Sequence, residues 1–151
     1  MSRFSEVVRN YLITAGWYEG REVFNKVKIP EGFKLFPAAI KVLREFGNLH
    51  IGECGKGKDC AKSDVRVDPS WEEGLELLLE PYSVEFGFKL LLIGRFHHEH
   101  SHLVLDEFGR VYALDDEFDP LATSFDQALE VLLLGIDFTR AARRPFEIKK
   151  N

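Results

Sequence analysis

The sequence predicts a single α+β domain built on a central, mainly antiparallel sheet with helices packed on one face. Extended segments cluster in the middle of the chain, and amphipathic helical patterns flank them. Two of the extended segments are joined by a short hairpin and not by the crossover helix that a parallel pair requires. With 45% hydrophobic residues, the 151-residue chain can bury one core. We expect the domain to span residues 1–136 and residues 137–151 to form a basic C-terminal tail.

The first helix is predicted over residues 2–16, because apolar side chains recur there at helical spacing. Ser2 or Ser5 can cap its N-terminus, and Gly16 can end it. Residues 17–29 are rich in aromatic and β-branched side chains, so we expect a turn there followed by an extended segment.

A second helix is predicted to begin at Pro37, because a proline ring suits the first helical position. Gly47 and Asn48 follow its last apolar residue and suit a left-handed C-cap. Residues 49–53 are a short strand candidate. The Gly, Lys and Asp residues of the segment from 52 to 64 predict a loop.

A third helix is predicted to begin at Ser70, which can form a capping box with Glu73. It carries an apolar stripe, and it is expected to kink or restart at Pro81. Its outer side would then present three glutamates at i,i+4 spacing: Glu72, Glu76 and Glu80.

The C-terminal half predicts one buried strand, a two-stranded hairpin and one helix. Residues 88–96 contain the apolar run Leu90 to Ile93 and predict a buried strand. Residues 102–115 alternate on both sides of a turn and predict a hairpin, in which Gly109 supplies the positive φ. The last helix is predicted from Ser124, which opens a second capping box, to Gly135, which ends it.

The net charge of −5 is unevenly distributed along the chain. Residues 68–126 hold fourteen Asp and Glu against three Lys and Arg, which makes the middle of the chain an acidic block. One interpretation is a solvated surface that keeps a small domain soluble, and the other is an acidic face that attracts a basic partner. Direct nucleic-acid binding is disfavoured, because the block would repel phosphates.

No apolar run approaches the ~20 residues that a bilayer span requires, and the N-terminus lacks the apolar region of a secretory signal. We therefore expect a cytoplasmic protein without a membrane partner, and a monomer in preference to an oligomer. Two cysteines, Cys54 and Cys60, are too few for the disulfide framework of a small secreted domain, so we interpret them as reduced thiols.

Four of the five histidines lie in one short stretch, and they raise the question of a metal site: His97, His98, His100 and His102. In an extended chain three of them would share one face, but residues four apart on a strand are ~13 Å apart, too far for one ion. Cys54 and Cys60 are also more widely spaced than the cysteines of a zinc knuckle. We therefore expect a polar connection between two strands, with no metal and no cofactor. A structural zinc ion remains the alternative if the stretch curls as a loop.

No catalytic constellation stands out, so we expect no enzymatic activity. Neither cysteine lies at a strand-to-helix elbow or a helix N-terminus that would activate it as a nucleophile. The Gly-rich run near Cys54 lacks the spacing of a phosphate-binding loop. Adjacent acids such as Asp115 and Asp116 carry little information in a chain with 25 acidic residues.

Six segments, taken in order, resemble the third group of the SUKH superfamily. They run from about Tyr11 to Gly135 and read "YLITAGWYEGREV", "FPAAIKVLREFGNLHI", "DP", "FGFKLLLIGRF", "LVLDEFGRVYAL" and "SFDQALEVLLLG". The resemblance implies an α+β fold with a mainly antiparallel sheet and a role as an immunity protein that binds and neutralises a toxin, often a nuclease. It implies no catalytic residues. The sequence departs from the family pattern at Asn48, where a second glycine is usual, and in the histidine cluster.

On this basis we expect an immunity protein that acts by occlusion, with an acidic face covering the basic substrate groove of a toxin. The predicted partner-binding residues form the loop "DDEFDP": Asp115, Asp116, Glu117 and Asp119, with Phe118 as an apolar anchor. The second choices are Glu72, Glu76 and Glu80. Two other classes stay open, namely an intracellular scaffold or regulatory binding module of the same fold, and a metal-dependent enzyme built around the histidines.

Overall fold

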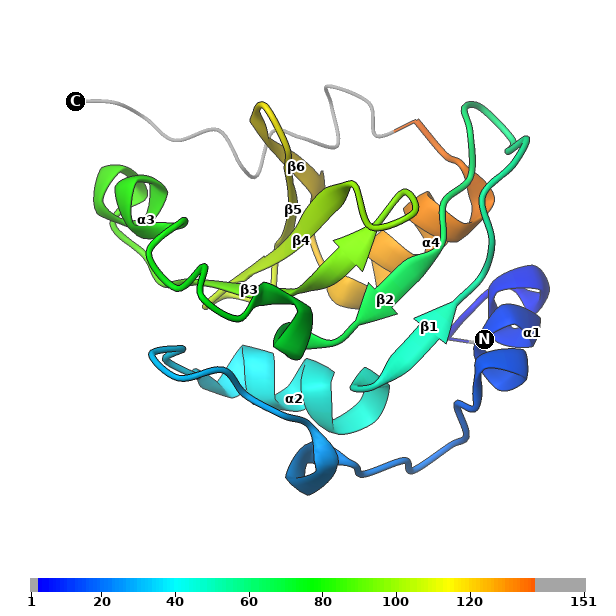
Figure 1. Cartoon of the computed structure of the whole chain (residues 1–151). Helices are drawn as coiled ribbons and strands as arrows, with labels where there is room; N and C mark the ends of the chain where they lie inside the picture. The colour runs from blue at the N-terminus through cyan, green and yellow to red at the C-terminus, as the bar shows by residue number, and fades with distance from the viewer. Residues whose placement is uncertain (1–2, 138–151) are drawn as a thin grey trace.

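The computed structural model describes residues 3–137 and contains one six-stranded sheet with four α-helices, which confirms the α+β prediction (Figure 1). The predicted C-terminal tail lies outside the described residues apart from its first residue. The helices are α1 (Glu6–Ala15), α2 (Pro37–Phe46), α3 (Glu80–Phe86) and α4 (Phe125–Leu134), with short 3-10 turns η1 (Phe24–Lys26) and η2 (Pro69–Glu72). The strands are β1 (Leu49–Ile51), β2 (Val65–Val67), β3 (Leu90–Phe96), β4 (Ser101–Asp106), β5 (Val111–Leu114) and β6 (Phe118–Ala122).

The sheet is a meander in which every strand pairs antiparallel with its neighbours in the sequence, in the order β1-β2-β3-β4-β5-β6. Consecutive antiparallel strands need only short connections, as the predicted hairpin from β4 to β5 shows. Within the described residues, no helix is long and apolar enough to cross a membrane.

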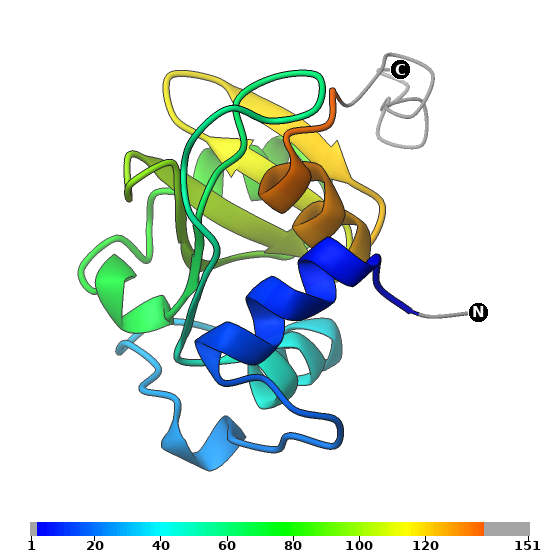
Figure 2. The same cartoon turned by 90° about the vertical axis from the view of Figure 1, so that its right-hand side faces the viewer.

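Helices α1, α2 and α4 cover one face of the sheet, as Figure 2 shows, and enclose the main core. Because side chains alternate along a strand, neighbouring residues of β3 enter different layers. Leu91 and Ile93 pack into the main core, whereas Leu92 joins a second, smaller cluster on the opposite face. That opposite face is covered by η2 and the segment that leads into α3. The prediction of helices on one face therefore holds for three helices, and α3 is the exception.

The helix ends follow the local signals in the sequence. The Ser5 side chain accepts a hydrogen bond from the Val8 N–H, and Gly16 ends α1 with a φ of 109°. Ser124 caps α4 by accepting from the Gln127 N–H. At the end of α2 the left-handed residue is Asn48, with a φ of 68°, and not Gly47. A side chain at Gly47 would instead collide with Val27, so close packing explains that glycine.

Two local predictions are wrong, and one strand was not predicted. Ser70 does not open a helix, because the Asp68 carboxylate accepts hydrogen bonds from both the N–H and the hydroxyl of Ser70 and caps the 3-10 turn η2. The α-helix begins only at Glu80. Residues 17–29 contain η1 and no strand, and the loop predicted from 52 to 64 is followed at once by β2, which the sequence did not indicate.

The turn between β4 and β5 is organised by Asp106, whose side chain is fully buried. Its carboxylate accepts hydrogen bonds from the backbone N–H of Phe108 and Arg110, from the Arg110 guanidinium at 2.6 Å and from the Tyr112 hydroxyl at 2.7 Å. Burial, and next the bond to Asp106, raise the pKa of Tyr112 well above its ordinary value, so this hydroxyl stays a donor. Gly109 has the predicted positive φ, at 89°.

An ion-pair network ties the N-terminus to α2 and α4. Arg3 donates to Glu45 at 2.7 Å and to Asp126 at 2.6 Å, and the Trp17 indole N–H donates to the same Glu45 carboxylate at 2.9 Å. Partial burial would raise the pKa of Glu45, but the hydrogen bonds from Arg3 and Trp17 outweigh it and hold this pKa below its usual range.

The Glu45 network predicts a pH-dependent stability. Glu45→Gln should lower the free energy of unfolding by about 1 kcal/mol at pH 7, a value reduced for the exposure of Arg3. Because the folded pKa is depressed, the stabilisation is complete above the unfolded pKa of about 4.3 and is lost as the pH falls through the folded pKa. Urea unfolding between pH 7 and pH 3 measures the difference, which should shrink towards zero in acid. Exposed Glu22→Gln is the control and should change little at any pH; a difference that persists in acid contradicts the assignment.

Candidate partner-binding site

Helix α3 is the most exposed helix of the described residues, because none of its side chains is buried. It is attached to the domain through the preceding turn, where Leu79 enters the second hydrophobic cluster. Val84 in this helix is 76% exposed, and Leu77 in the turn before it is 69% exposed. Contact between aliphatic side chains and water is unfavourable. Exposed apolar patches on soluble domains therefore mark interaction sites.

A groove of about 550 Å³ runs along one side of α3. Its lining includes Glu76, Leu77, Glu80 and Val84 from the α3 side, together with residues 32–34. Residues 90–92 of β3 also line it, and its two basic residues are Lys34 and Lys89. Two of the glutamates predicted as second choices, Glu76 and Glu80, thus lie at this groove and are exposed.

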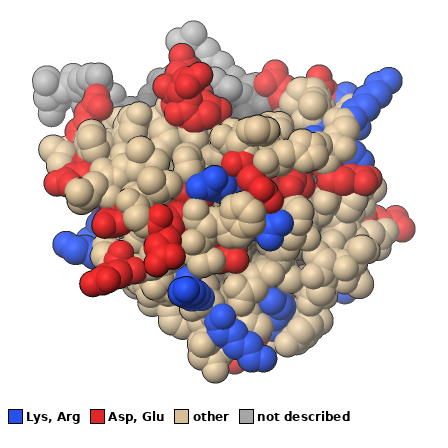
Figure 3. Space-filling view, viewed as in Figure 1, with Lys and Arg blue, Asp and Glu red and all other residues tan. Residues whose placement is uncertain are grey.

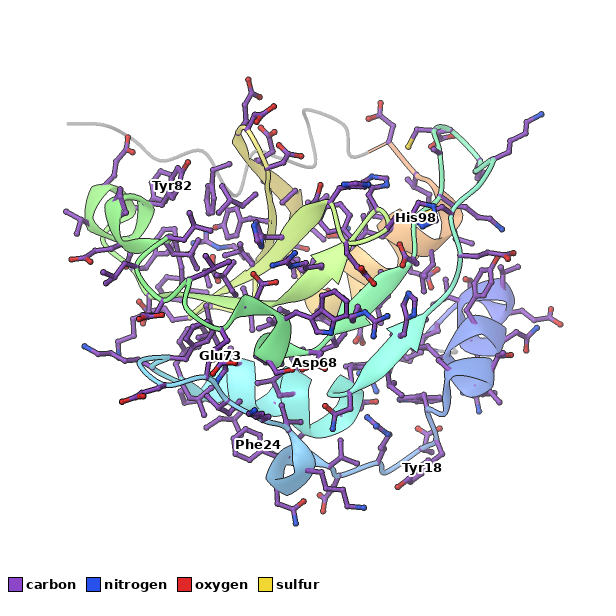
Figure 4. All side chains as sticks on the ribbon, viewed as in Figure 1. Tyr18, Phe24, Asp68, Glu73, Tyr82 and His98 are labelled. Carbon is purple, nitrogen blue, oxygen red and sulfur yellow. The ribbon has the colours of Figure 1, made fainter. Side chains whose placement is uncertain are left out.

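Aromatic side chains fill the space between the other side of α3 and the sheet. Tyr82 stacks on Phe118 with ring centroids 4.6 Å apart, and Phe118 stacks in turn on Tyr112 at 4.8 Å. Phe86 packs against Phe118 at 5.5 Å and against Phe88 at 5.6 Å. Figure 4 shows Tyr82 on the side of α3 that faces the sheet. All of these rings except Tyr112 remain partly exposed, so they hold α3 in place and also offer rigid aromatic surface.

The turn between β5 and β6 carries the acids that the sequence singled out. Asp115, Asp116 and Glu117 are exposed at its tip. The Asp115 carboxylate accepts hydrogen bonds from the Glu117 N–H and the Ser101 hydroxyl, which shapes the turn. The side chains of Asp116 and Glu117 are therefore the ones directed to solvent. In Figure 3 acidic side chains gather at the top of the view, over this tip, and along the left side, with uncharged surface between them.

Two of the predicted binding residues lie in β6 and not in a loop. Phe118 is the first residue of β6 and the centre of the aromatic stack, so it is a packed side chain and not a free anchor. Asp119 follows it in the strand and is half-buried.

Glu72 is fully buried, so the prediction that it is exposed on the outer side of a helix is wrong. Its carboxylate accepts from the Arg95 guanidinium at 2.6 Å and lies 2.7 Å from Nδ1 of His102. These contacts fasten η2 to β3 and β4. The neighbouring Trp71 ring lies over Arg66, with the guanidinium carbon 4.6 Å from the ring centre. Glu72 is therefore a structural residue.

The α3 face, as we use the term, combines residues of α3 and of the turn before it with the first residue of β6 and the acidic tip: Leu77, Glu80, Tyr82, Val84, Phe118 and the turn 115–117. The stack of Tyr82 on Phe118 brings the two parts together, because Phe118 directly follows the tip in the chain. The sequence reasoning missed the exposed aliphatic residues Leu77 and Val84. A signal existed in the run Leu77 to Leu79, because three consecutive leucines cannot all face one core, and only Leu79 is buried.

The histidine cluster forms a tight turn and not an extended strand. His97, His98 and Glu99 all have left-handed backbone, with φ values of 51°, 52° and 71°. The turn is fastened to the chain before β2, because the His97 N–H donates to the Ser63 hydroxyl and the His98 N–H donates to Asp64. Residues 97–100 thus form the predicted polar connection between two strands, whereas His102 lies in β4. The histidines do not share one face: His102 reaches Glu72, while His98 (labelled in Figure 4) lies beside Asp64.

An α+β domain that presents exposed aliphatic side chains and partly exposed aromatic rings close to an acidic turn has the kind of surface that binds other proteins. The SUKH-3 immunity protein family model matches residues 4–135, and the chain belongs to that family. No curated protein and no solved structure matches the chain. Family membership confirms the resemblance found in the sequence and makes this an immunity protein that binds and neutralises a toxin.

Proposed function

We propose that the chain neutralises its toxin by occlusion, with the α3 face laid over a basic surface at the toxin's active site. The observation that carries this proposal is the pair of exposed aliphatic side chains, Leu77 and Val84, on a helical segment that stacks through Tyr82 on the strand that follows the acidic tip. Apolar and aromatic side chains at the centre of an interface supply most of the affinity, and charges at its rim speed encounter and exclude wrong partners. The α3 face offers both in one place.

A nuclease is the toxin class that best fits the charge of this surface. A groove that binds nucleic acid must present Lys and Arg to phosphates, and the acids of the tip and of Glu80 would pair with the same side chains. Stable protein complexes bury roughly 800 Å² on each partner. The tip, the aromatic cluster and the outer side of α3 are contiguous and can contribute to a patch of that kind.

Reversing the tip charges tests the electrostatic part of the proposal. Asp116→Lys with Glu117→Lys should slow association with the cognate toxin by about tenfold at low salt, because rim charges act mainly on the encounter rate. It should also flatten the dependence of that rate on ionic strength. Stopped-flow or surface plasmon resonance measurements at several salt concentrations give both quantities.

The matched control is Glu19→Lys with Glu22→Lys, which makes the same change in net charge on two other exposed glutamates. These residues follow Tyr18, which lies at the lower right of Figure 4, away from the tip at the top. A control that slows association as much as the tip variant would show that only net charge matters. An unchanged tip variant would remove the tip from the interface.

A further inference from the structure

A second cluster of chemically active side chains lies outside the α3 face. The thiol of Cys54, the carboxylate of Asp64 and a ring nitrogen of His98 all lie within 4.8 Å of one another. They come from two separate segments, because Cys54 and Asp64 are in the loop before β2 and His98 is in the β3–β4 turn. The second cysteine, Cys60, is exposed and does not belong to the cluster.

The carboxylate of Asp64 is the fixed centre of this cluster. Asp64 is 5% exposed, and its Oδ1 accepts from the Cys54 thiol at 3.4 Å and from the His98 N–H at 2.9 Å. Its Oδ2 lies 2.6 Å from Nε2 of His50. A carboxylate whose second oxygen is held by an imidazole is oriented as metal-binding carboxylates usually are.

The backbone of the β3–β4 turn brings His98 to this carboxylate at an energetic cost. Three consecutive residues without glycine adopt the left-handed region, which costs of order 1 kcal/mol for each residue. The hydrogen bonds from His97 to Ser63 and from His98 to Asp64 hold the turn in this form. The sequence argument against a metal assumed an extended chain, and this turn removes that assumption.

We propose that Cys54, Asp64 and His98 bind one divalent transition-metal ion of the zinc type, with His50 orienting Asp64. Sulfur, imidazole and carboxylate donors in one site suit Zn²⁺ or Co²⁺ and not Ca²⁺ or Mg²⁺, which take oxygen ligands. Ligand atoms around a tetrahedral zinc ion are ~3.5 Å apart, so the cluster must contract by about 1 Å. The exposed His98 side chain can supply that movement. On binding, the Cys54 thiol releases its proton to solvent and the thiolate forms the metal–sulfur bond.

The site would join the loop before β2 to the β3–β4 turn with three protein ligands and leave a fourth position open to water or another donor. This role does not depend on the α3 face, so the metal and the toxin surface can be tested separately.

Cobalt titration of the full chain tests the site, with the metal-free protein kept under a phosphine reductant. Co²⁺ alone should bind at one equivalent and produce a near-ultraviolet thiolate-to-cobalt charge-transfer band together with the visible bands of a four-coordinate ion. Addition of Zn²⁺ should abolish both. Absence of the charge-transfer band at saturating Co²⁺ overturns the proposal.

Variants assign the ligands. Cys54→Ser should abolish the charge-transfer band, and His98→Asn, which tolerates the left-handed backbone, should weaken Co²⁺ binding at least tenfold. Cys60→Ser and His100→Ala are the matched controls and should leave the band and the affinity unchanged. Urea unfolding of metal-free Cys54→Ser should match that of the original chain, which separates loss of a ligand from loss of the fold. A band that depends on Cys60, or one that survives Cys54→Ser, assigns the metal to other groups and overturns the site.

Discussion

Replacing Leu77 and Val84 together with arginine is expected to weaken toxin binding at least hundredfold, about 2.8 kcal/mol. Both side chains are more than two-thirds exposed in the free protein and line the groove beside α3. In the proposed complex both side chains would be buried. Each arginine would then bury a charge without a partner, and it would also be repelled by the basic surface of the toxin. Isothermal titration calorimetry with the purified toxin measures the loss.

A second pair of exposed aliphatic residues provides the control for this experiment. Val7 and Ile13 on α1 are 53% and 51% exposed, and replacing both with arginine makes the same chemical change on a different helix. We expect this pair to bind toxin within threefold of the original chain. Both double variants should keep their free energy of unfolding within about 1 kcal/mol, because all four positions are at the surface. Equal losses for the two pairs, or no loss for the α3 pair, would contradict the proposed interface.

Gly94→Ala is expected to lower the free energy of unfolding by at least about 3 kcal/mol, the largest effect on stability that we predict from a single methyl group. Gly94 lies in β3 at an irregularity in its pairing with β4. A Cβ atom there would lie 1.8 Å from the carbonyl oxygen of Arg66 in β2. That oxygen belongs to the backbone, so relief requires β2 to move away from β3 and to break the two pairs that join them. Urea unfolding measures the loss.

Gly74→Ala separates this collision from the general cost of replacing a glycine. Gly74 has a φ of 86°, but a Cβ atom there would meet nothing within 4 Å. The substitution should therefore cost only the about 1 to 2 kcal/mol of a left-handed alanine. If Gly94→Ala proves no worse than Gly74→Ala, then β2 is not held as tightly against β3 as the structure shows.

Most helix ends and the central hairpin could be predicted from the sequence because their signals are local. The serine before α1, the proline that opens α2 and the glycine after α4 each act within one turn of the residue concerned. The same local logic failed at Ser70. A nearer acceptor, Asp68, takes the Ser70 N–H and hydroxyl, and the burial of Glu72 against Arg95 keeps η2 short.

The short strand β2 could not be predicted, because three residues carry too little pattern and its pairing partners come from segments on both sides of it in the chain.

The candidate site was predicted only in part. The acids of the tip are exposed as a polar turn should be, whereas Phe118 and Asp119 lie in β6 because the stack on Tyr82 and Tyr112 extends the ladder. Their part in toxin binding remains a prediction.

The order of residues was sufficient for the fold class, the family and the acidic character of the middle of the chain, because each follows from composition and from patterns a few residues long. Folding determined which acids are buried, since the contacts of Glu72 and Asp106 with arginine depend on strands that the sequence pattern does not place in register. Folding also left α3 uncovered and turned His98 back onto Asp64. Both features arise from contacts between segments that are distant in the chain. The free energies of such contacts cannot be deduced from a local sequence pattern.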